Sequence, residues 1–339
     1  MRADRDPFAA RIGARASAIL RRTVGRRYRL TELSGDASTR RFLRARGARG
    51  AAVLMLHPEP LDPSSPLYSN YRVLRAIGAP VPRLLGSDDA AGVVVVGDLG
   101  ETTLQRHLAR PGRAAARQRR RLYRQACDLI ALLQVKGSRA LRPGDFAARH
   151  ALDRERFLLE LDHFHHHFVH RLRGMRPSPG ESAVLRAFYT DLAARCDRQP
   201  RVYCHRDFQS RNLMVRRGRI HLIDFQDARM GPYTYDAASL LRDSSLDLDE
   251  RLADELAGYL AGRLGLGTEE FRSDLDLMAL QRNIKDLGTF AYQTAVRLRR
   301  DYLSYIPRAI RLIRRCLTRR RLYHPIYAIL EEFILSYPP

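Results

Sequence analysis

Three side chains that carry oxygen stand at fixed offsets in the middle of the chain, within CHRDFQSRNLMV (204–215) and IDFQD (223–227). Asn212 follows Asp207 by five residues, and Asp224 follows Asn212 by twelve. The intervening segment RRG is typical of a tight hairpin turn, which would place two short strands side by side. The three side chains would then meet at one end of a β-ribbon. No other feature of the sequence constrains the fold as strongly.

Phosphoryl transfer needs the groups that this spacing provides. The reaction uses a carboxylate that accepts or orients the proton of the attacking hydroxyl, and hard oxygen ligands that hold Mg²⁺ against nucleotide phosphates. Asp207 suits the first role, and Asn212 and Asp224 suit the second. We therefore expect Asp207 to be the catalytic residue of a kinase site and Asn212 and Asp224 to be its magnesium ligands.

Hydrophobic periodicity divides the chain into two unequal parts. The first part alternates as strands do and contains one helical pattern, at 65–79; its strands are expected at 27–35, 39–47, 51–58 and twice within 81–100. The second part is mostly helical, with a short β segment around Asp207 and helices expected at 102–109, 113–136, 152–172 and 180–197. We expect a nucleotide-binding lobe over 1–98 and a helical lobe over 99–339 that carries the catalytic loop and the substrate site.

The motifs of the ribbon resemble those of a known family. His205-Arg206-Asp207 with Asn212 resembles the H-R-D-x-x-x-x-N catalytic loop of protein kinases, and DFQ at 224–226 looks like their D-F-G. The longer pattern HRDFQSRNLMV…IDFQDARMGPYTYDAASLLRD is similar to that of the aminoglycoside phosphotransferase family. SGDASTRRFLR and the late QRNIKDLGTFA resemble its bacterial branch of N-acetylmuramate/N-acetylglucosamine 1-kinases of cell-wall recycling.

The resemblance implies a bilobal, protein-kinase-like α+β fold and an enzyme that uses ATP and Mg²⁺. It also implies a small hydroxylated acceptor, with the anomeric hydroxyl of N-acetylmuramate or N-acetylglucosamine expected first. A kinase of another sugar or amino alcohol, or a pseudokinase that acts as a binding scaffold, remains an alternative. The basic chain suits the carboxylate of N-acetylmuramate and disfavours polycationic aminoglycosides. The absence of Trp disfavours an aromatic cage for choline.

Several residues near the motifs receive roles from the resemblance and from their positions. His205 and Arg206 are expected to support the catalytic loop, and Asp236, which precedes an apolar helix, is expected to cap that helix or brace the loop. Asp227 and Arg211 are the candidate sugar-binding residues.

The nucleotide is expected to contact two segments of the first lobe. In the hinge VVVVGDLGE, Asp98 and Leu99 would bind adenine through backbone groups. In LSGDASTRRF, a loop between two strands would close over the phosphates with N–H and hydroxyl donors from Ser34, Gly35, Asp36 and Ser38.

The first lobe departs from the kinase pattern in one respect. Kinases carry a Lys on the third strand, paired with a Glu on the next helix. Here Met55 stands near that place, no Lys precedes Lys136, and the helix has no Glu. The joint absence indicates a different phosphate grip, and a guanidinium is suited to it. The candidates are Arg40, Arg41 and Arg44, of which Arg41 and Arg44 are favoured because they lie further from the loop tip.

Composition limits the expected partners and location. The formal net charge is +23, but 58 of the 60 basic residues are Arg and spread along the chain, without a nucleic-acid motif. No run approaches the roughly 18 apolar residues of a membrane span. Four cysteines without a C-x-x-C pair fit a reducing cytoplasm. We expect a cytoplasmic enzyme with a small-molecule sugar as its partner, without membrane or nucleic acid; the oligomeric state stays open.

The histidine-rich segment DHFHHHFVH (162–170) raises a second possible site. His163/His167 and His166/His170 are spaced four apart, as metal-binding pairs on a helix are. The segment lacks H-E-x-x-H, and its aromatic residues indicate a half-buried helix. We therefore favour surface or substrate-pocket histidines over a metal site.

Overall fold

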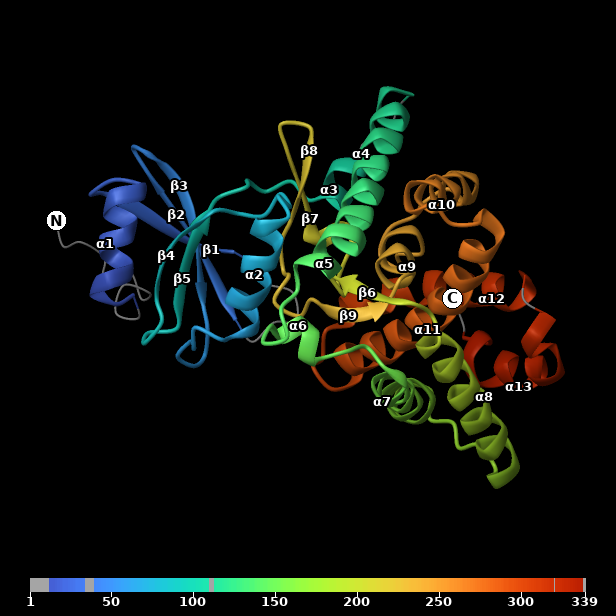
Figure 1. Ribbon diagram of the computed structural model, residues 1–339. Coiled ribbons are helices and arrows are strands. Elements are labelled where there is room, and N and C mark those ends of the chain that lie inside the picture. The colour runs from blue at the N-terminus through green and yellow to red at the C-terminus, as the bar shows by residue number, and fades with distance from the viewer. Residues whose placement is uncertain (1–11, 34–39, 110–112, 320, 338–339) are drawn as a thin grey trace.

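The computed structural model describes residues 12–33, 40–109, 113–319 and 321–337, which form a β-rich lobe and a larger helical lobe (Figure 1). The last strand of the first lobe ends at Gly97, and the first helix of the second lobe begins at Leu104. The expected boundary between residues 98 and 99 falls in this connection. Within the described ranges, no helix is both long enough and apolar enough to cross a membrane.

The sheet of the first lobe contributes to two separate cores. Its antiparallel strands lie in the order β1 (Tyr28–Leu33), β2 (Arg41–Gly47), β3 (Gly50–Leu56), β5 (Val93–Gly97) and β4 (Leu84–Asp88). Val93 and Val95 pack with helix α1 (Ala14–Thr23), whereas Val94 belongs to the apolar cluster that contains Leu74 of α2 (Pro66–Ala76). Successive side chains of a strand point to opposite faces, so α1 covers one face and α2 joins the other face to the second lobe.

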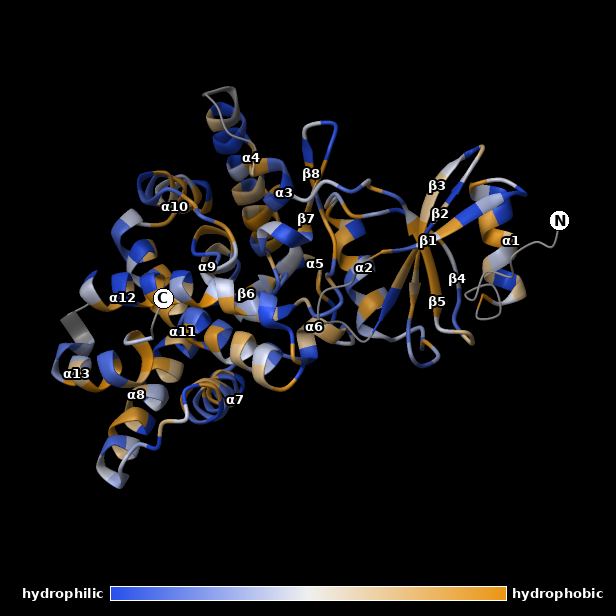
Figure 2. Cartoon of the chain, turned by 180° about the vertical axis from the view of Figure 1, so that it is seen from behind, coloured by the Kyte–Doolittle hydropathy of each residue, from blue (hydrophilic) through white to orange (hydrophobic). Residues whose placement is uncertain are grey.

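One long helix, α11 (Thr268–Ala295), forms the centre of the second lobe and is buried along most of its length (Figures 1 and 2). A Cβ atom at Gly288 would lie only 2.6 Å from the Cα atom of Phe164, so glycine lets α11 cross its neighbour closely. Helices that pack against α11 are α7 (Arg154–Phe164), α8 (Pro179–Asp197), α9 (Tyr235–Leu241), α10 (Glu250–Leu264) and α12 (Ile306–Arg319).

Shorter helical elements complete this lobe. The helices are α3 (Leu104–Leu108), α4 (Arg113–Leu132), α5 (Ser138–Ala140), α6 (Phe146–Arg149) and α13 (Tyr327–Leu330). Wider π-helical turns continue three helices: η2 (Leu133–Gly137), η3 (His165–Leu172) and η7 (Glu331–Leu335). The 3₁₀ turns are η4 (Ser210–Asn212), η5 (Arg300–Tyr305) and η6 (Arg321–Ile326).

Two short β-ribbons frame the catalytic loop. The hairpin predicted from RRG is confirmed, because β7 (Leu213–Arg216) pairs with β8 (Arg219–Leu222). Its turn residues Arg217 and Gly218 have φ angles of 49° and 73°, the positive values that suit a two-residue hairpin turn. The strand before the loop, β6 (Arg201–Cys204), pairs instead with β9 (Arg229–Pro232). The catalytic loop therefore leaves one ribbon and enters the other.

Candidate active site

The catalytic loop after β6 rests on a buried carboxylate. Asp236, in the first turn of α9, is 1% exposed and accepts hydrogen bonds from the backbone N–H groups of His205 (2.7 Å) and Arg206 (3.0 Å). Arg206 has a φ of 76°, a left-handed conformation that costs free energy in a residue with a side chain. The two bonds to one carboxylate hold this strained residue in place, directly before Asp207.

His205 connects the catalytic loop to the segment that carries Asp224. Its side chain is buried, and its Nε2 atom donates a hydrogen bond to the carbonyl oxygen of Ile223 (3.0 Å). The N–H group of Ile223 in turn donates to the carbonyl oxygen of Asn212 (3.1 Å). These two bonds fix the segment before Asp224 against the loop that carries Asp207 and Asn212.

The environment of Asp207 keeps its carboxyl group ionised. Burial alone would raise its pKa, but the positive charges of Lys285, Arg206 and Arg282 outweigh burial and lower the pKa below its usual value. An ionised carboxylate can accept or orient the proton of a hydroxyl group. Asn212 donates from Nδ2 to the carbonyl oxygen of Asp207 (2.9 Å), which leaves the amide oxygen of Asn212 for another partner.

Asp224 occupies a second strained position, with a φ of 64°. Its Oδ1 atom accepts hydrogen bonds from Nη2 of Arg40 (2.7 Å) and from Nε2 of Gln226 (3.1 Å). The Asp224 side chain is 34% exposed and can still be approached. Asp224 offers a carboxylate oxygen and Asn212 an amide oxygen. Mg²⁺ prefers such hard oxygen ligands in a protein when phosphates supply its other ligands. The residues present therefore fit this metal.

The three candidate arginines of the first lobe lie in three different environments. Arg40 crosses to Asp224 in the second lobe, and its side chain is 13% exposed. Arg41 pairs with Glu32 at the surface (2.8 Å). The sequence favours Arg41 and Arg44 for the phosphates, yet Arg44 is buried at the hinge, where it binds Asp98 (2.8 Å), Glu101 (2.6 Å) and the carbonyl oxygen of Gly100 (2.7 Å). Strand alternation gives the side on which an arginine lies, but it does not give the end of the strand that meets the second lobe.

The other expected nucleotide contacts are only partly described. Ser34, Gly35, Asp36 and Ser38 lie outside the described residues. Asp98 and Leu99 follow β5 in the connection between the lobes. The carboxylate of Asp98 binds Arg44 and the N–H group of Gly100 (2.8 Å), which shapes the backbone of this connection.

The expected sugar-binding residues lie beside the catalytic loop. Asp227 is 40% exposed on its side chain and pairs with Arg229 (3.1 Å) and Arg206 (3.3 Å). Arg211 is partly exposed in η4, between Asp207 and Asn212. Their contact with a sugar stays a prediction.

Sequence reasoning missed three residues near the site. Nη1 of Arg282 approaches the carbonyl oxygen of Arg206 (3.4 Å), and one turn further along α11 Lys285 acts electrostatically on Asp207. Asn70, fully buried in α2, donates to the carbonyl oxygens of Gln226 (2.9 Å) and Ala228 (3.0 Å). One signal was available for Lys285: it is one of two lysines in a chain whose other basic residues are Arg. For Asn70 the sequence offered no such signal, apart from a polar residue on the face of α2 that carries Leu67 and Leu74.

The histidine-rich segment lies on α7 and η3. The rings of His163 and His167 have centroids 4.3 Å apart, and both rings contact Tyr292 of α11, at 5.6 and 5.1 Å. In the described part of the chain, no group of three His, Cys, Asp or Glu side chains is arranged to hold a metal ion.

Comparison with known proteins gives the class to which this fold and site belong. Residues 29–272 match the model of the phosphotransferase enzyme family (APH), and the chain belongs to that family. It is therefore an enzyme of the phosphotransferase class, and the family predicted from the motifs is confirmed.

Curated relatives narrow the comparison further. The chain is 32% identical to the N-acetylmuramate/N-acetylglucosamine kinase of Neisseria meningitidis, over 91% of this chain and 92% of the relative. It is 31% identical to the enzyme of the same name from Pseudomonas aeruginosa, over 91% of this chain and 88% of the relative.

Solved structures agree on the fold. A choline/ethanolamine kinase family protein from Mesorhizobium loti superposes with a TM-score of 0.58 at 18% identity, covering 95% of this chain and 99% of that one. The gentamicin complex of APH(2")-IIa gives 0.58 at 13% identity, covering 88% and 96%. APH(2")-IIa in its ternary complex with streptomycin and ATP gives 0.55 at 13% identity, covering 81% and 90%. The expected bilobal kinase-like fold is thereby confirmed.

Proposed function

We propose that this chain is an ATP- and Mg²⁺-dependent amino-sugar kinase that phosphorylates the anomeric hydroxyl of N-acetylmuramate or N-acetylglucosamine. The observation that carries the proposal is the interlocked placement of Asp207, Asn212 and Asp224 on a loop braced by Asp236. The names of the curated relatives support the choice of sugar. Four buried cysteines that are free thiols suit a cytoplasmic location.

In this proposal the residues of the second lobe position the acceptor. Asp207 is ionised, so its carboxylate orients the attacking hydroxyl and accepts its proton as the new oxygen–phosphorus bond forms and the bond between the γ-phosphorus and ADP breaks, releasing ADP. Asn212 and Asp224 would hold Mg²⁺, and the bound ion would neutralise charge on the transferred phosphoryl group. Asp227 and Arg211, which lie beside the catalytic loop, are assigned to contact the hydroxyl groups of the sugar.

We assign the missing cation of the first lobe to Arg40. The guanidinium already reaches Asp224, so it lies where nucleotide phosphates would meet the metal ligands. Its rigid fork binds two oxygens at once, and it needs no orienting Glu on α2. The missing lysine of the third strand is the main reason to consider a pseudokinase, and Arg40 would supply the cation in its place.

A sugar panel with the purified protein tests the function. We expect Mg²⁺-dependent consumption of ATP and a sugar 1-phosphate, identified by phosphorus NMR, with N-acetylmuramate or N-acetylglucosamine as the best acceptor. Asp207→Asn should lower turnover by roughly 10²–10⁴-fold, the scale of general acid–base catalysis, with nucleotide affinity near that of the wild type. Asp197→Asn, which alters a surface pair with Arg201, is the matched control. Wild-type turnover in Asp207→Asn would remove this residue from the mechanism, and a better acceptor of another class would replace the proposed sugar.

A further inference from the structure

Between residues 278 and 291, helix α11 is buried on almost every side but keeps one narrow accessible stripe. Lys285 and Thr289 are the two side chains in this range that are not buried, and Tyr292 follows them as a partly exposed residue. These positions are spaced by four and three residues, so they lie on one face of the helix. The stripe therefore presents an ammonium group, a hydroxyl group and an aromatic ring in a row.

The close crossing of α11 with α7 brings the histidines to this stripe. Gly288 touches the backbone of Phe164, so the residues next to Gly288 on α11 lie close to the residues next to Phe164. His163 precedes Phe164, and its ring contacts that of Tyr292. His167 lies one turn further and also contacts Tyr292. The histidine-rich segment thus forms a wall beside the stripe.

The other end of the stripe lies at the catalytic loop. Arg282, three residues before Lys285 on α11, approaches the carbonyl oxygen of Arg206 at 3.4 Å. The Nζ atom of Lys285 is 3.8 Å from Oδ1 of Asp286, a distance too long for a hydrogen bond. The other oxygen of Asp286 accepts a hydrogen bond from Ser244. Lys285 therefore has its ammonium group between the catalytic loop and the histidine wall.

We infer that Lys285, with Thr289, Tyr292 and His163 around it, forms the subsite that binds a carboxylate substituent of the acceptor sugar and so favours N-acetylmuramate over N-acetylglucosamine. This inference rests on the proposed function, because it concerns the acceptor of the same reaction. The two sugars differ by a lactyl ether that carries the carboxylate, so a single cation at the right place can tell them apart. A half-buried ammonium group binds a carboxylate more strongly than an exposed one does, because water screens it less.

Lys285 supplies the positive charge of this subsite. Burial, the charge of His166 and the charge of Lys285 lower the pKa of His163. Burial and the neighbouring histidines lower the pKa of His167 to about 4. Both rings are therefore neutral near pH 7 and offer an aromatic surface and hydrogen bonds.

The test compares the two sugars in wild type and in Lys285→Met, which removes the charge and keeps the length of the side chain. We expect the ratio of kcat/KM for N-acetylmuramate to that for N-acetylglucosamine to fall about 10- to 100-fold, mainly through KM, as when a charge-assisted hydrogen bond is lost. An effect of Lys285 through Asp207 changes both sugars alike and cancels in the ratio. Lys285→Arg should keep most of the preference. Lys136→Met, which alters the exposed lysine of η2, should leave the ratio unchanged.

A second measurement does not depend on any variant. Calorimetry without nucleotide compares wild-type binding of N-acetylmuramate and of its uncharged methyl ester, and we expect the ester to bind about 10-fold or more weakly. Equal affinities for acid and ester, or an unchanged ratio in Lys285→Met, would overturn the carboxylate subsite while the sugar kinase activity stands. Wild-type protein that turns over neither sugar would overturn the proposed function, and this inference with it.

Discussion

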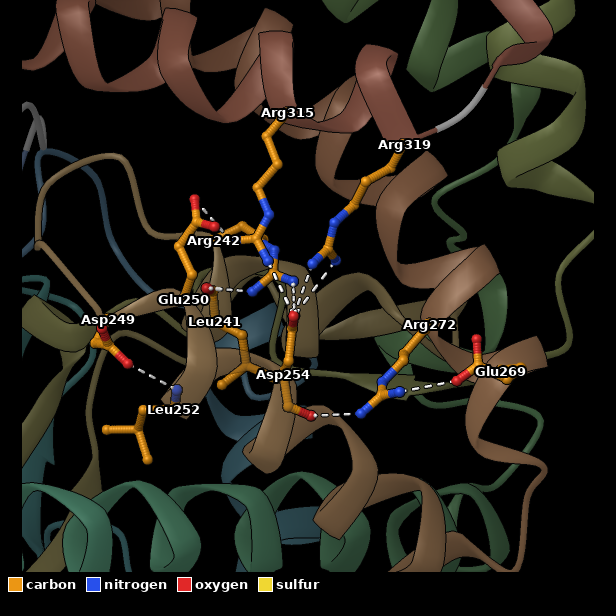
Figure 3. A network of polar contacts seen from close by, with 10 residues as sticks. All are labelled: Leu241, Arg242, Asp249, Glu250, Leu252, Asp254, Glu269, Arg272, Arg315 and Arg319. Atoms are coloured by element: carbon orange, nitrogen blue, oxygen red, sulfur yellow. Dashed lines mark hydrogen bonds and ion pairs between the residues drawn. The ribbon is translucent and has the colours of Figure 1, made fainter.

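Asp224 and Asp254 both accept hydrogen bonds from arginine, yet the two aspartates stand in opposite settings. Asp254, in the second turn of α10, binds three guanidinium groups: Arg242 at 2.9 Å, Arg315 at 3.0 Å and Arg319 at 2.7 Å (Figure 3). These arginines follow α9 or belong to α12, and all belong to the helical lobe. Asp224 has a left-handed backbone and meets Arg40 from the other lobe.

The ion pairs of Asp254 connect elements within one lobe and stabilise the fold. We expect the ion pair between Arg40 and Asp224 to belong to the candidate site. Asp254 has a regular helical backbone. Its arginines lie in α12 or directly after α9, and buried side chains already fix the positions of these helices relative to α10. Asp224 has a strained backbone and pairs with Arg40, which directly precedes β2 of the other lobe. Strain and a partner from another lobe are both features of functional positions. We therefore expect substitutions at the two aspartates to have opposite consequences.

The largest effect is expected for Asp224→Ala. A hard cation would lose a charged oxygen ligand, so Mg²⁺-dependent ATP binding should be abolished and turnover should fall by at least about 10³-fold. The midpoint of thermal unfolding without ligands should change little, because the Asp224 side chain is 34% exposed and its ion pair with Arg40 is only partly buried. Calorimetry with Mg-ATP measures the first effect. Unchanged affinity would refute the assignment of the metal site and remove the contrast with Asp254.

Arg40→Ala should have the next largest effect. Loss of one preorganised cation should reduce transition-state stabilisation by roughly 2–4 kcal/mol, measured as kcat/KM at saturating sugar. Arg41→Ala is the matched control, because Arg41 pairs with Glu32 at the surface one residue away. If Arg40→Ala and Arg41→Ala behave alike, the phosphate grip lies elsewhere, and backbone groups of the neighbouring loop become the better explanation.

Asp254→Ala should damage stability and spare activity. Three guanidinium groups would be left without their shared acceptor, and 26% of the Asp254 side chain is exposed. We expect the free energy of unfolding in urea to fall by about 2 kcal/mol, below the roughly 3–5 kcal/mol of a fully buried pair. The kcat/KM value should stay within about twofold of wild type. A loss of turnover without a loss of stability would reverse the roles of the two aspartates.

The smallest effect concerns pH. Burial would raise the pKa of Asp254, but the hydrogen bond from Arg319 and the charges of Arg242 and Arg315 lower it below its ordinary value of 3.8. The contribution to stability is thus present above this value and lost as pH falls through the lower pKa of the folded state. The difference in unfolding midpoint between wild type and Asp254→Asn should therefore narrow below about pH 4. A constant difference from pH 6 to pH 3 would contradict it.

Local rules were sufficient for much of the fold. The hairpin at Arg217 and Gly218 and the change from strands to helices near residue 98 follow from short-range patterns, and both are seen. The π-helical turns after α4 and α7 were not foreseen, because they depend on packing rather than on periodicity.

The site was accessible to sequence only where its residues share a motif. Asp207, Asn212 and Asp224 lie within 20 residues and were assigned together. Arg40, Asn70 and Lys285 come from distant segments. Only the folded chain brings Arg40 and Asn70 to the segment that begins at Asp224, and Lys285 to the catalytic loop. Strand alternation separates Arg40 and Arg44 from Arg41, but it carries no information on which end of the strand faces the second lobe, and Arg40 was not among the favoured candidates.

The anchoring of α2 has a consequence for control of the enzyme. Many protein kinases are switched by moving the equivalent helix, which brings its Glu to the catalytic Lys or takes it away. Here Asn70 ties α2 to the backbone on both sides of Asp227 and accepts a hydrogen bond from Tyr203 of β6 (3.2 Å). These three hydrogen bonds fix α2 to the second lobe, and α2 carries no Glu whose movement could assemble or break an ion pair. We therefore expect α2 and the segment around Asp227 to move as one body, so that an inward or outward swing of α2 alone would cost the hydrogen bonds of a buried amide.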